Sequence, residues 1–424
     1  MASELKQRLE TVLSIFSFDN LASDVQSEIV PIKAQDGGES RGVVYQKGSQ
    51  QPETVVMVIH PRTDSTRHYA IPGLVEAGFA AFGHNTRWLN NDIETIHEKL
   101  ALDVAAAVKT FRERGYKHVV LLGNSGGGAL YTFYQAQAAR PGQRVTATPA
   151  GDPPDLNEFD MPEVDAVIQL ATHAGPGRFL QNCIDPSVTD EHDSLSVDPR
   201  LDMYDPDNGY RSPPEPTTFS AEFLERYRAG QRIRVQRLDA IARQSIDEQR
   251  RAEALLASSR FTQLSARDQL KLRQRAAAGT IMTIWRTMAD PGYVDLSIDP
   301  SDRDRGSIRS TNPETYNVTE FGYARVLTPR AWLSSWSGGA CQVDTIEMSR
   351  HVTVPTLHIG ARCDREVLPQ KDTIPIFENT SGHDKTLVWI EGADPFFRPS
   401  PHTGKGDERD RTLSAIANWL RERF

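Results

Sequence analysis

Gly123-Asn124-Ser125-Gly126-Gly127 is the most informative stretch of this chain. An apolar, β-branched run, 118–122, leads into it, and a small-residue pattern typical of a helix, 128–139, follows it. Glycines beside a serine allow a sharp turn between strand and helix that exposes the serine oxygen. We therefore predict a strand, a tight turn and a helix, with Ser125 as a nucleophile. The alternative is an ordinary glycine-rich turn.

The composition of the 424-residue chain is that of a globular protein, with 38% hydrophobic and 25% charged residues. A net charge of −9 argues against nucleic acid or an anionic membrane surface as a partner. The three cysteines are widely separated and lack the spacing of a zinc site or a disulfide framework, which favours a reducing compartment. No apolar run approaches the roughly 20 residues that cross a bilayer, and the N-terminal charges do not fit a signal peptide. We expect a cytoplasmic protein.

Strands and helices alternate on both sides of Ser125, which predicts a mostly parallel sheet covered by helices on both faces. The expected strands span 28–33, 42–47, 54–60, 79–84, 118–122, 164–172, 352–360 and 385–390. The expected helices around them span 1–20, 67–77, 92–114, 128–139 and 407–424.

A block of different composition interrupts this alternation. Its parts are a proline- and aspartate-rich segment at 185–216, arginine-rich helical patterns at 220–245 and 247–289, and an aromatic-rich segment at 290–345. We interpret residues 177–350 as a mainly helical cap, inserted after the sixth core strand, and residues 1–176 and 351–424 as the two parts of the core. The cap arginines, among them Arg226, Arg232 and Arg234, are expected on solvated helix faces.

The chain resembles the α/β-hydrolase superfamily. Four stretches carry the resemblance: Thr54–Arg62, Gly123–Gly128, Pro355–Asp364 and Val388–Phe397. The resemblance covers the core in two pieces and implies an α/β-hydrolase fold. It also implies the order nucleophile, acid, histidine along the chain.

A serine hydrolase needs a base and a carboxylate that orients the base. The resemblance places Asp364 at the acid position. The alternatives are that Asp364 opens a turn, or that Glu366 is the acid.

The histidine position is unusual, because the stretch Glu391-Gly392-Ala393-Asp394-Pro395 has a proline where the resembling family has a histidine. His402, seven residues later in a loop rich in proline, glycine and serine, is our prediction for the base. The alternatives are an exposed loop histidine with a broken triad, or a base supplied by His173 or His84.

The resemblance also implies two backbone donors for an oxyanion. One is the N–H of Gly126, and because Pro61 has no N–H, the other is the N–H of Arg62. His60 is a candidate for ordering this loop, and the Arg62 side chain for binding a substrate carboxylate.

Aromatic residues of the cap could line an apolar pocket at the junction with the core, where ligand sites are frequent. We predict His60, His173, Trp332 and Trp336 as substrate-binding residues, although each aromatic residue alone is more often part of a core.

These observations predict a serine hydrolase that cleaves a carboxylic ester or related acyl bond of a small, largely apolar or aromatic molecule through Ser125, His402 and Asp364. The alternatives are a hydrolase of a carbon–carbon bond in a diketone, and a ligand-binding homologue that lost the histidine. No metal or cofactor is expected, because the histidines lack metal-ligand spacing and the glycine run lacks a Gly-Lys-Ser/Thr ending. A small molecule is the expected partner, and a homodimer through the cap is an open alternative.

Overall fold

A computed structural model describes residues 17–424 of the chain. The helix expected at 1–20 therefore lies outside the described residues over 1–16. Within the described part, no helix combines the length and the apolar character needed to cross a bilayer.

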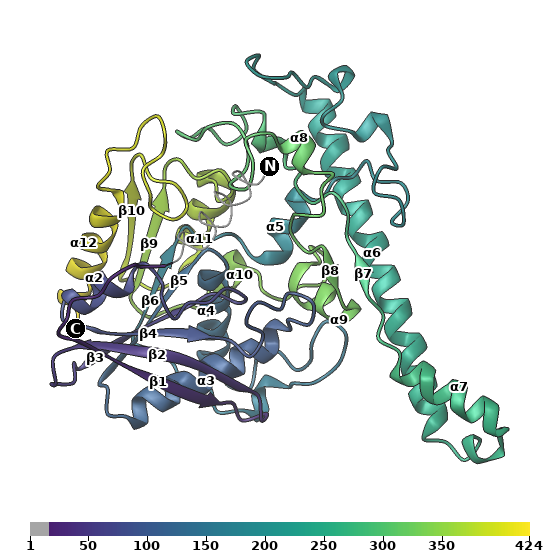
Figure 1. The fold of residues 1–424 in the computed structure, drawn as a ribbon, viewed down its shortest axis with the longest axis horizontal. Coiled ribbons are helices and arrows are strands. Elements are labelled where there is room, and N and C mark those ends of the chain that lie inside the picture. Colours follow the sequence, from purple (N-terminus) through teal and green to yellow (C-terminus); the bar gives the residue numbers. More distant parts are fainter. Residues whose placement is uncertain (1–16) are drawn as a thin grey trace.

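The centre of the molecule is an eight-stranded sheet with the order β1-β2-β4-β3-β5-β6-β9-β10 (Figure 1). The strands are β1 (Val25–Lys33), β2 (Glu39–Lys47), β3 (Thr54–Ile59), β4 (Ala80–Asn85), β5 (His118–Asn124), β6 (Ala166–Leu170), β9 (Thr356–Ala361) and β10 (Lys385–Ile390). Strand β2 is antiparallel to both of its neighbours, and the other pairs are parallel. This order, with a strand–turn–helix elbow after β5, is the α/β-hydrolase fold, which confirms the predicted fold class.

Helices cover both faces of the sheet, and the side chains of β3 show why its sequence is continuously apolar. Val55 and Met57 pack in one cluster with α3 (His97–Glu113) and α4 (Gly126–Ala138). Val56 packs on the opposite face with α2 (Ile71–Glu76) and α12 (Glu408–Arg421). Because both faces are covered, every residue of β3 is buried.

The chain between β6 and β9 forms a second hydrophobic core of its own, which includes Tyr227, Leu238 and Trp332. Its elements are α5 (Pro176–Cys183), α6 (Ala221–Leu256), α7 (Ala266–Ala277), β7 (Met282–Thr283), α8 (Pro313–Tyr316), β8 (Val326–Leu327), α9 (Pro329–Ala331) and a π-helix (Trp332–Trp336). Helix α6 runs along one edge of the molecule and continues beyond the sheet layers, where α7 lies beside its end (Figure 1). The chain returns through α10 (Thr345–Ser349) to β9, and α11 (Ile374–Asn379) joins β9 to β10.

The expected bounds of the two long helices in this segment are wrong. Helix α6 is continuous over 36 residues, through the break expected between 245 and 247. No glycine or proline stands there to interrupt the hydrogen-bond ladder. The next helix ends at Ala277, and the β-branched run after Gly279 pairs as β7 with β8 instead.

The arginines of α6 do not share one environment. Arg226 and Arg232 are exposed, as expected, but Arg234 is 1% exposed. Its guanidinium pairs with Glu191 at 2.8 Å and donates to the carbonyl of Asp185. The prediction of a solvated face is wrong for Arg234, because the proline- and aspartate-rich segment folds over α6 and supplies the carboxylate.

Candidate active site

Ser125 lies between β5 and α4 in a backbone conformation that residues other than glycine rarely adopt. Its φ is 53° and its ψ is −118°. Its backbone N–H donates to the carbonyl of Leu170 at 2.8 Å, which fixes the turn against β6. Ser125 is partly exposed, whereas the residues on either side of it are buried. The surrounding structure thus holds a strained serine with its side chain accessible, as in a nucleophile elbow.

The four glycines of the elbow meet different surroundings. A Cβ on Gly123, Gly127 or Gly128 would lie 2.3, 2.0 or 1.9 Å from its nearest neighbour, so close packing requires glycine at these three positions. At Gly126 the nearest atoms are 3.4 Å away or more, and they are His60 Nε2, His173 Nε2 and Pro61 Cδ. The missing side chain of Gly126 therefore leaves room beside Ser125 that two imidazole rings border.

The hydrogen bonds of these two rings determine which nitrogen carries the proton. His60 Nδ1 accepts the N–H groups of Arg62 at 3.3 Å and Thr63 at 3.1 Å. His173 Nδ1 accepts the N–H of Gly175 at 3.1 Å. A neutral imidazole that accepts at Nδ1 carries its proton on Nε2. Both Nε2 atoms that border Gly126 are therefore N–H donors.

The same rings are poor bases. Burial, and after it the positive charge of Arg62, lowers the pKa of both His60 and His173 to about 3. Both are neutral at physiological pH, and their Nε2 atoms already carry a proton. Neither ring can take the proton of Ser125, so the alternative of His173 as the base is not supported.

The two expected oxyanion donors differ in whether their N–H groups are already hydrogen-bonded. Gly126 is the first residue of α4, and its N–H has no acceptor within the helix. It belongs to the group of N–H donors that form the positive end of the helix dipole. The N–H of Arg62 is engaged with His60 Nδ1, so its predicted role as an oxyanion donor is not supported. The Nε2 atoms of His60 and His173 lie 3.4 and 3.5 Å from the position that a Cβ of Gly126 would occupy.

The Arg62 side chain lies against Trp336 and Asp92. Arg62 Nε donates to Asp92 Oδ1, and the guanidinium stacks over the Trp336 ring at 4.4 Å. Trp336 Nε1 donates to the same oxygen of Asp92 at 3.1 Å. Arg62 Nη2 is buried and has no hydrogen-bond partner among residues 17–424.

A row of aromatic rings runs from Trp336 to His173. Tyr323 lies 6.3 Å from Trp336, Phe179 lies 4.9 Å from Tyr323, and His173 lies 5.3 Å from Phe179, between ring centres. The structure thus brings together His60, His173 and Trp336, three of the four predicted substrate-binding residues. Phe179 was not predicted, and no motif in α5 marks it.

Trp332 is the fourth predicted substrate-binding residue, and it lies elsewhere. Its side chain is fully buried in the core of the segment between β6 and β9, and its Nε1 donates to Asp239 on α6 at 2.7 Å. A role of Trp332 in substrate binding is not supported by this position, because its ring stabilises the packing of α6.

Asp364 is buried in the turn that follows β9. Its Oδ1 accepts the N–H groups of Glu366 at 2.8 Å and Val367 at 3.0 Å, as a turn-capping aspartate does. Its Oδ2 is buried and has no hydrogen-bond partner in the described part of the chain. Burial raises the pKa of Asp364 well above its ordinary value. Glu366 accepts the Tyr293 hydroxyl at 2.7 Å, and burial raises its pKa to about 7.

The structure does not bring His402 together with Ser125 and Asp364. The His402 side chain is 75% exposed, with Nε2 3.6 Å from Asp304 Oδ1. The loop after β10 instead reaches the elbow through the carbonyl of Pro395, 3.5 Å from Asn124 Nδ2. Asp394 Oδ1 accepts the N–H groups of Phe396 and Arg398 in a tight turn. The exposed part of the loop is 401–407, which contains His402.

His84, the other outside candidate for the base, lies in β4. Its Nε2 forms a hydrogen bond with the Ser40 hydroxyl at 3.1 Å, and its ring stacks with Phe82. It is a core residue between β2 and β4, and a role as the base is not supported.

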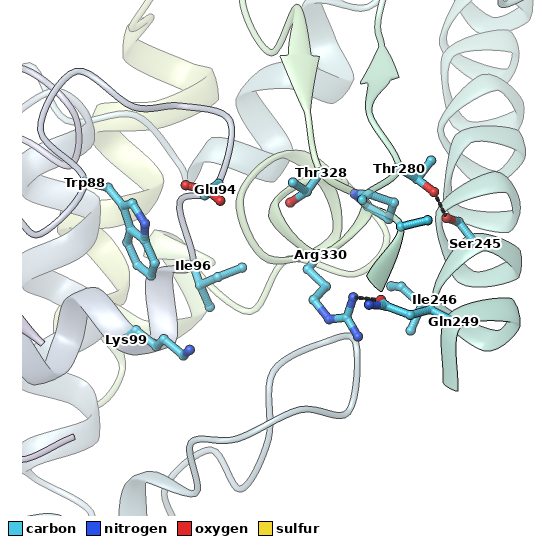
Figure 2. Close-up of a pocket in the computed structure, with 13 residues that line it drawn as sticks. Trp88, Glu94, Ile96, Lys99, Ser245, Ile246, Gln249, Thr280, Thr328 and Arg330 are labelled. Atoms are coloured by element: carbon cyan, nitrogen blue, oxygen red, sulfur yellow. Dashed lines mark hydrogen bonds between the residues drawn. The ribbon is translucent and has the colours of Figure 1, made fainter. Parts of the chain in front are cut away.

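A cavity of about 320 Å³ lies apart from the elbow (Figure 2). Trp88, Ile96 and Lys99 line it from the core, and Ile246, Thr280 and Arg330 line it from the segment between β6 and β9. Arg330 is held there by Gln249, to which it donates at 2.8 Å. None of the residues around Ser125 lines this cavity, so it is separate from the candidate active site.

No protein-family model and no curated protein sequence matches the chain. Similar solved structures include an alpha/beta hydrolase from Penicillium sp. sh18, at 12% identity and a TM-score of 0.48, over 94% of this chain and 98% of that chain. The esterase domain of a Rhodothermus marinus protein is similar at 12% identity and a TM-score of 0.42, over 94% and 98%. A hypothetical protein from Pseudomonas aeruginosa is similar at 11% identity and a TM-score of 0.48, over 97% and 98%.

Proposed function

We propose that this chain, which has the α/β-hydrolase fold, is a hydrolase that cleaves the acyl bond of a small ester-like substrate with Ser125 as the nucleophile. The observation that carries the proposal is the backbone of Ser125, at φ 53° beside Gly126. A strained conformation of this kind costs on the order of 1–3 kcal/mol and is found mainly where function requires it. Because one fold hosts many activities, the proposal rests on this site and not on the fold.

In the proposed reaction, Ser125 Oγ attacks the acyl carbon, and the carbonyl oxygen becomes an oxyanion. The N–H of Gly126 and the Nε2–H groups of His60 and His173 donate to that oxyanion. Donors that are fixed in place before the reaction are usually the largest single contribution to such catalysis. The alcohol then leaves, and water hydrolyses the acyl group from Ser125.

The proton of the Ser125 hydroxyl needs an acceptor, and we assign it to Asp364 Oδ2. This oxygen is buried without a hydrogen-bond partner in the described residues. Asp364 follows β9 and Ser125 follows β5 at the same edge of the sheet, with β6 between the two strands. The proposal requires Oδ2 to reach Ser125 directly or through one water molecule. The proton passes from Ser125 to Asp364, and then from Asp364 to the leaving alkoxide.

The row of aromatic rings formed by Phe179, Tyr323 and Trp336 favours a substrate with a flat or apolar part. These rings lie in a continuous row that ends at His173, next to the elbow. Aromatic and apolar side chains typically line small-molecule sites, and a few polar groups orient the ligand.

Turnover of p-nitrophenyl acetate and butyrate by wild type, Ser125→Ala and Ser259→Ala tests this function. Ser259 is an exposed serine near α7, so its variant is a matched control. We expect the loss of Ser125 to lower kcat about 10³-fold or more, and Ser259→Ala to behave as wild type. Equal turnover by wild type and Ser125→Ala would overturn the proposal.

A further inference from the structure

We propose that the substrate carries a carboxylate in addition to the bond that is cleaved, and that Arg62 binds this carboxylate. The inference rests on the hydrolase function proposed above, because it names the class of substrate at the same site. The substrate class is then a monoester of a short dicarboxylic acid, or another acyl compound with a carboxylate close to the cleaved bond.

The side chain of Arg62 has a buried donor without a hydrogen-bond partner among residues 17–424. Its side chain is only 15% exposed, its Nε is bound to Asp92, and its Nη2 is buried without a partner among residues 17–424. Leaving a buried N–H of a charged group unpaired is costly. A guanidinium presents several donors in a planar fork that matches a carboxylate. Asp92 occupies one edge of the fork, and the Nη2 edge is left for a second acceptor.

Arg62 lies next to the histidines that border Gly126. The backbone N–H of Arg62 donates to His60 Nδ1 at 3.3 Å. Its guanidinium stacks over Trp336, the ring at which the aromatic row from His173 ends. The two histidine rings border Gly126, next to Ser125. A carboxylate on the fork would therefore lie within one small molecule's length of the attacked carbonyl.

Hydrogen-bond donors and a positive charge lie close to Gly126. The two imidazoles beside Gly126 present Nε2–H donors, and Arg62 is the positive charge next to them. Asp364 is the acceptor in the proposed mechanism, and Lys371 is paired with Asp290 at 3.2 Å. A site of donors and positive charge favours a negatively charged ligand over a neutral one of equal shape.

Stacking fixes the fork in place before a ligand arrives. The guanidinium lies over the Trp336 ring at 4.4 Å, and Asp92 binds both side chains. A preorganised arginine loses little conformational entropy on binding, which raises its contribution to affinity.

The experiment compares two p-nitrophenyl esters, the hemisuccinate and its methyl ester, which differ only in the methyl group on the carboxylate. Rates are measured on wild type, Arg62→Gln and Arg267→Gln after subtraction of spontaneous hydrolysis. Arg267 is an exposed arginine on α7 and supplies the matched control. We expect wild type and Arg267→Gln to prefer the acid by about 10-fold or more in kcat/KM, as for a hydrogen bond to a charged group. In Arg62→Gln the ratio of the two kcat/KM values should fall close to one. Equal kcat/KM values for the two esters on wild type would overturn the inference and leave the hydrolase function intact.

A second measurement keeps the inference testable if no ester is turned over or if Arg62→Gln does not fold. Calorimetric titration of Ser125→Ala with monomethyl glutarate, dimethyl glutarate and inorganic phosphate reads binding without turnover. Binding of monomethyl glutarate alone supports a carboxylate site. Equal affinity for the neutral diester, or binding of phosphate alone, overturns it. Absence of turnover in wild type would contradict the hydrolase function and would not by itself bear on this titration.

Discussion

The imidazoles of His60 and His173 border one point in space, the position that a Cβ of Gly126 would occupy, with their Nε2 atoms 3.4 and 3.5 Å from it. Backbone N–H groups donate to Nδ1 of both rings, so both Nε2 atoms are donors. In the proposed mechanism the two histidines are therefore hydrogen-bond donors to an oxyanion beside Ser125 and not bases.

Gly126→Ala should therefore block the site without unfolding the protein. The new methyl group has van der Waals room, but it fills the space between the two imidazoles. We expect kcat/KM to fall by about 10²-fold or more, as when an oxyanion site is lost, with Tm nearly unchanged. Gly127→Ala is the contrasting variant, because its Cβ would lie 2.0 Å from the carbonyl oxygen of Ile59, and it should lower Tm strongly. Full activity in Gly126→Ala would exclude a substrate position between the rings.

His173→Phe should keep the shape of the ring and remove its donor. We expect kcat to fall by about 10²- to 10³-fold, as for the loss of one oxyanion donor, with a smaller change in KM. His173→Gln retains an N–H donor and should recover part of the loss. The measurement is steady-state kinetics on a p-nitrophenyl ester, with His383→Phe, on an exposed loop, as the control. Equal kcat values in wild type and His173→Phe would exclude the donor role.

The rate should rise with pH because Asp364 must be ionised to accept a proton. Its pKa is raised well above the ordinary value, so its ionised fraction increases at a higher pH than that of an ordinary aspartate. His60 and His173, with a pKa of about 3, should add no step between pH 5 and pH 9. Asp364→Asn should lose activity at every pH, and His402→Ala should keep it. A bell-shaped profile with an acid limb that His402→Ala abolishes would instead identify His402 as the base.

The same carboxyl group should make the fold less stable at alkaline pH. Because the folded state holds the Asp364 proton to a higher pH than the unfolded state, the free energy of unfolding decreases as pH rises from about 4 through the folded pKa. Asp364→Asn removes this dependence, so its Tm relative to wild type should increase as pH rises above about 4. The check is thermal unfolding followed by circular dichroism. A constant difference in Tm across that range would mean that Asp364 titrates alike in both states.

Arg234→Ala should destabilise the protein by about 1.5–3 kcal/mol, because it removes one of the two arginines that pair with the buried Glu191 and leaves only Arg237. Arg226→Ala changes an exposed residue of the same helix and should change the free energy of unfolding by less than about 0.5 kcal/mol. Urea denaturation of both variants measures the two values. Equal effects would show that the Arg234–Glu191 pair contributes no more than a surface charge.

Local patterns of the sequence predicted those parts of the fold that depend on local physics. Strand β10 matches its predicted bounds, and the continuous apolar run of β3 correctly indicated burial on both faces. The turn at Ser125 could be predicted because its glycines are required by the backbone geometry of a few neighbouring residues. Helix α6 was misjudged at its C-terminal end, because no local signal stops it near residue 246.

The parts that could not be predicted depend on contacts between distant segments. Arg234 is buried only because Glu191 folds over it, and Trp332 turns to Asp239. The donor role of His60 and His173 depends on which backbone N–H groups reach Nδ1, which no spacing in the sequence reveals. Pro395 stands where a histidine was expected, and the choice of His402 as its replacement rested on distance along the chain. The structure places the His402 side chain at 75% exposure.

The most direct test of the central claim is intact mass spectrometry after exposure to a fluorophosphonate probe, which modifies activated serines. It should be run on wild type, Ser125→Ala, Asp364→Asn and His402→Ala. The account predicts one adduct on wild type and His402→Ala, no adduct on Ser125→Ala, and slowed labelling of Asp364→Asn. An unlabelled wild type, or an adduct that persists in Ser125→Ala, would contradict the assignment of Ser125 as the nucleophile.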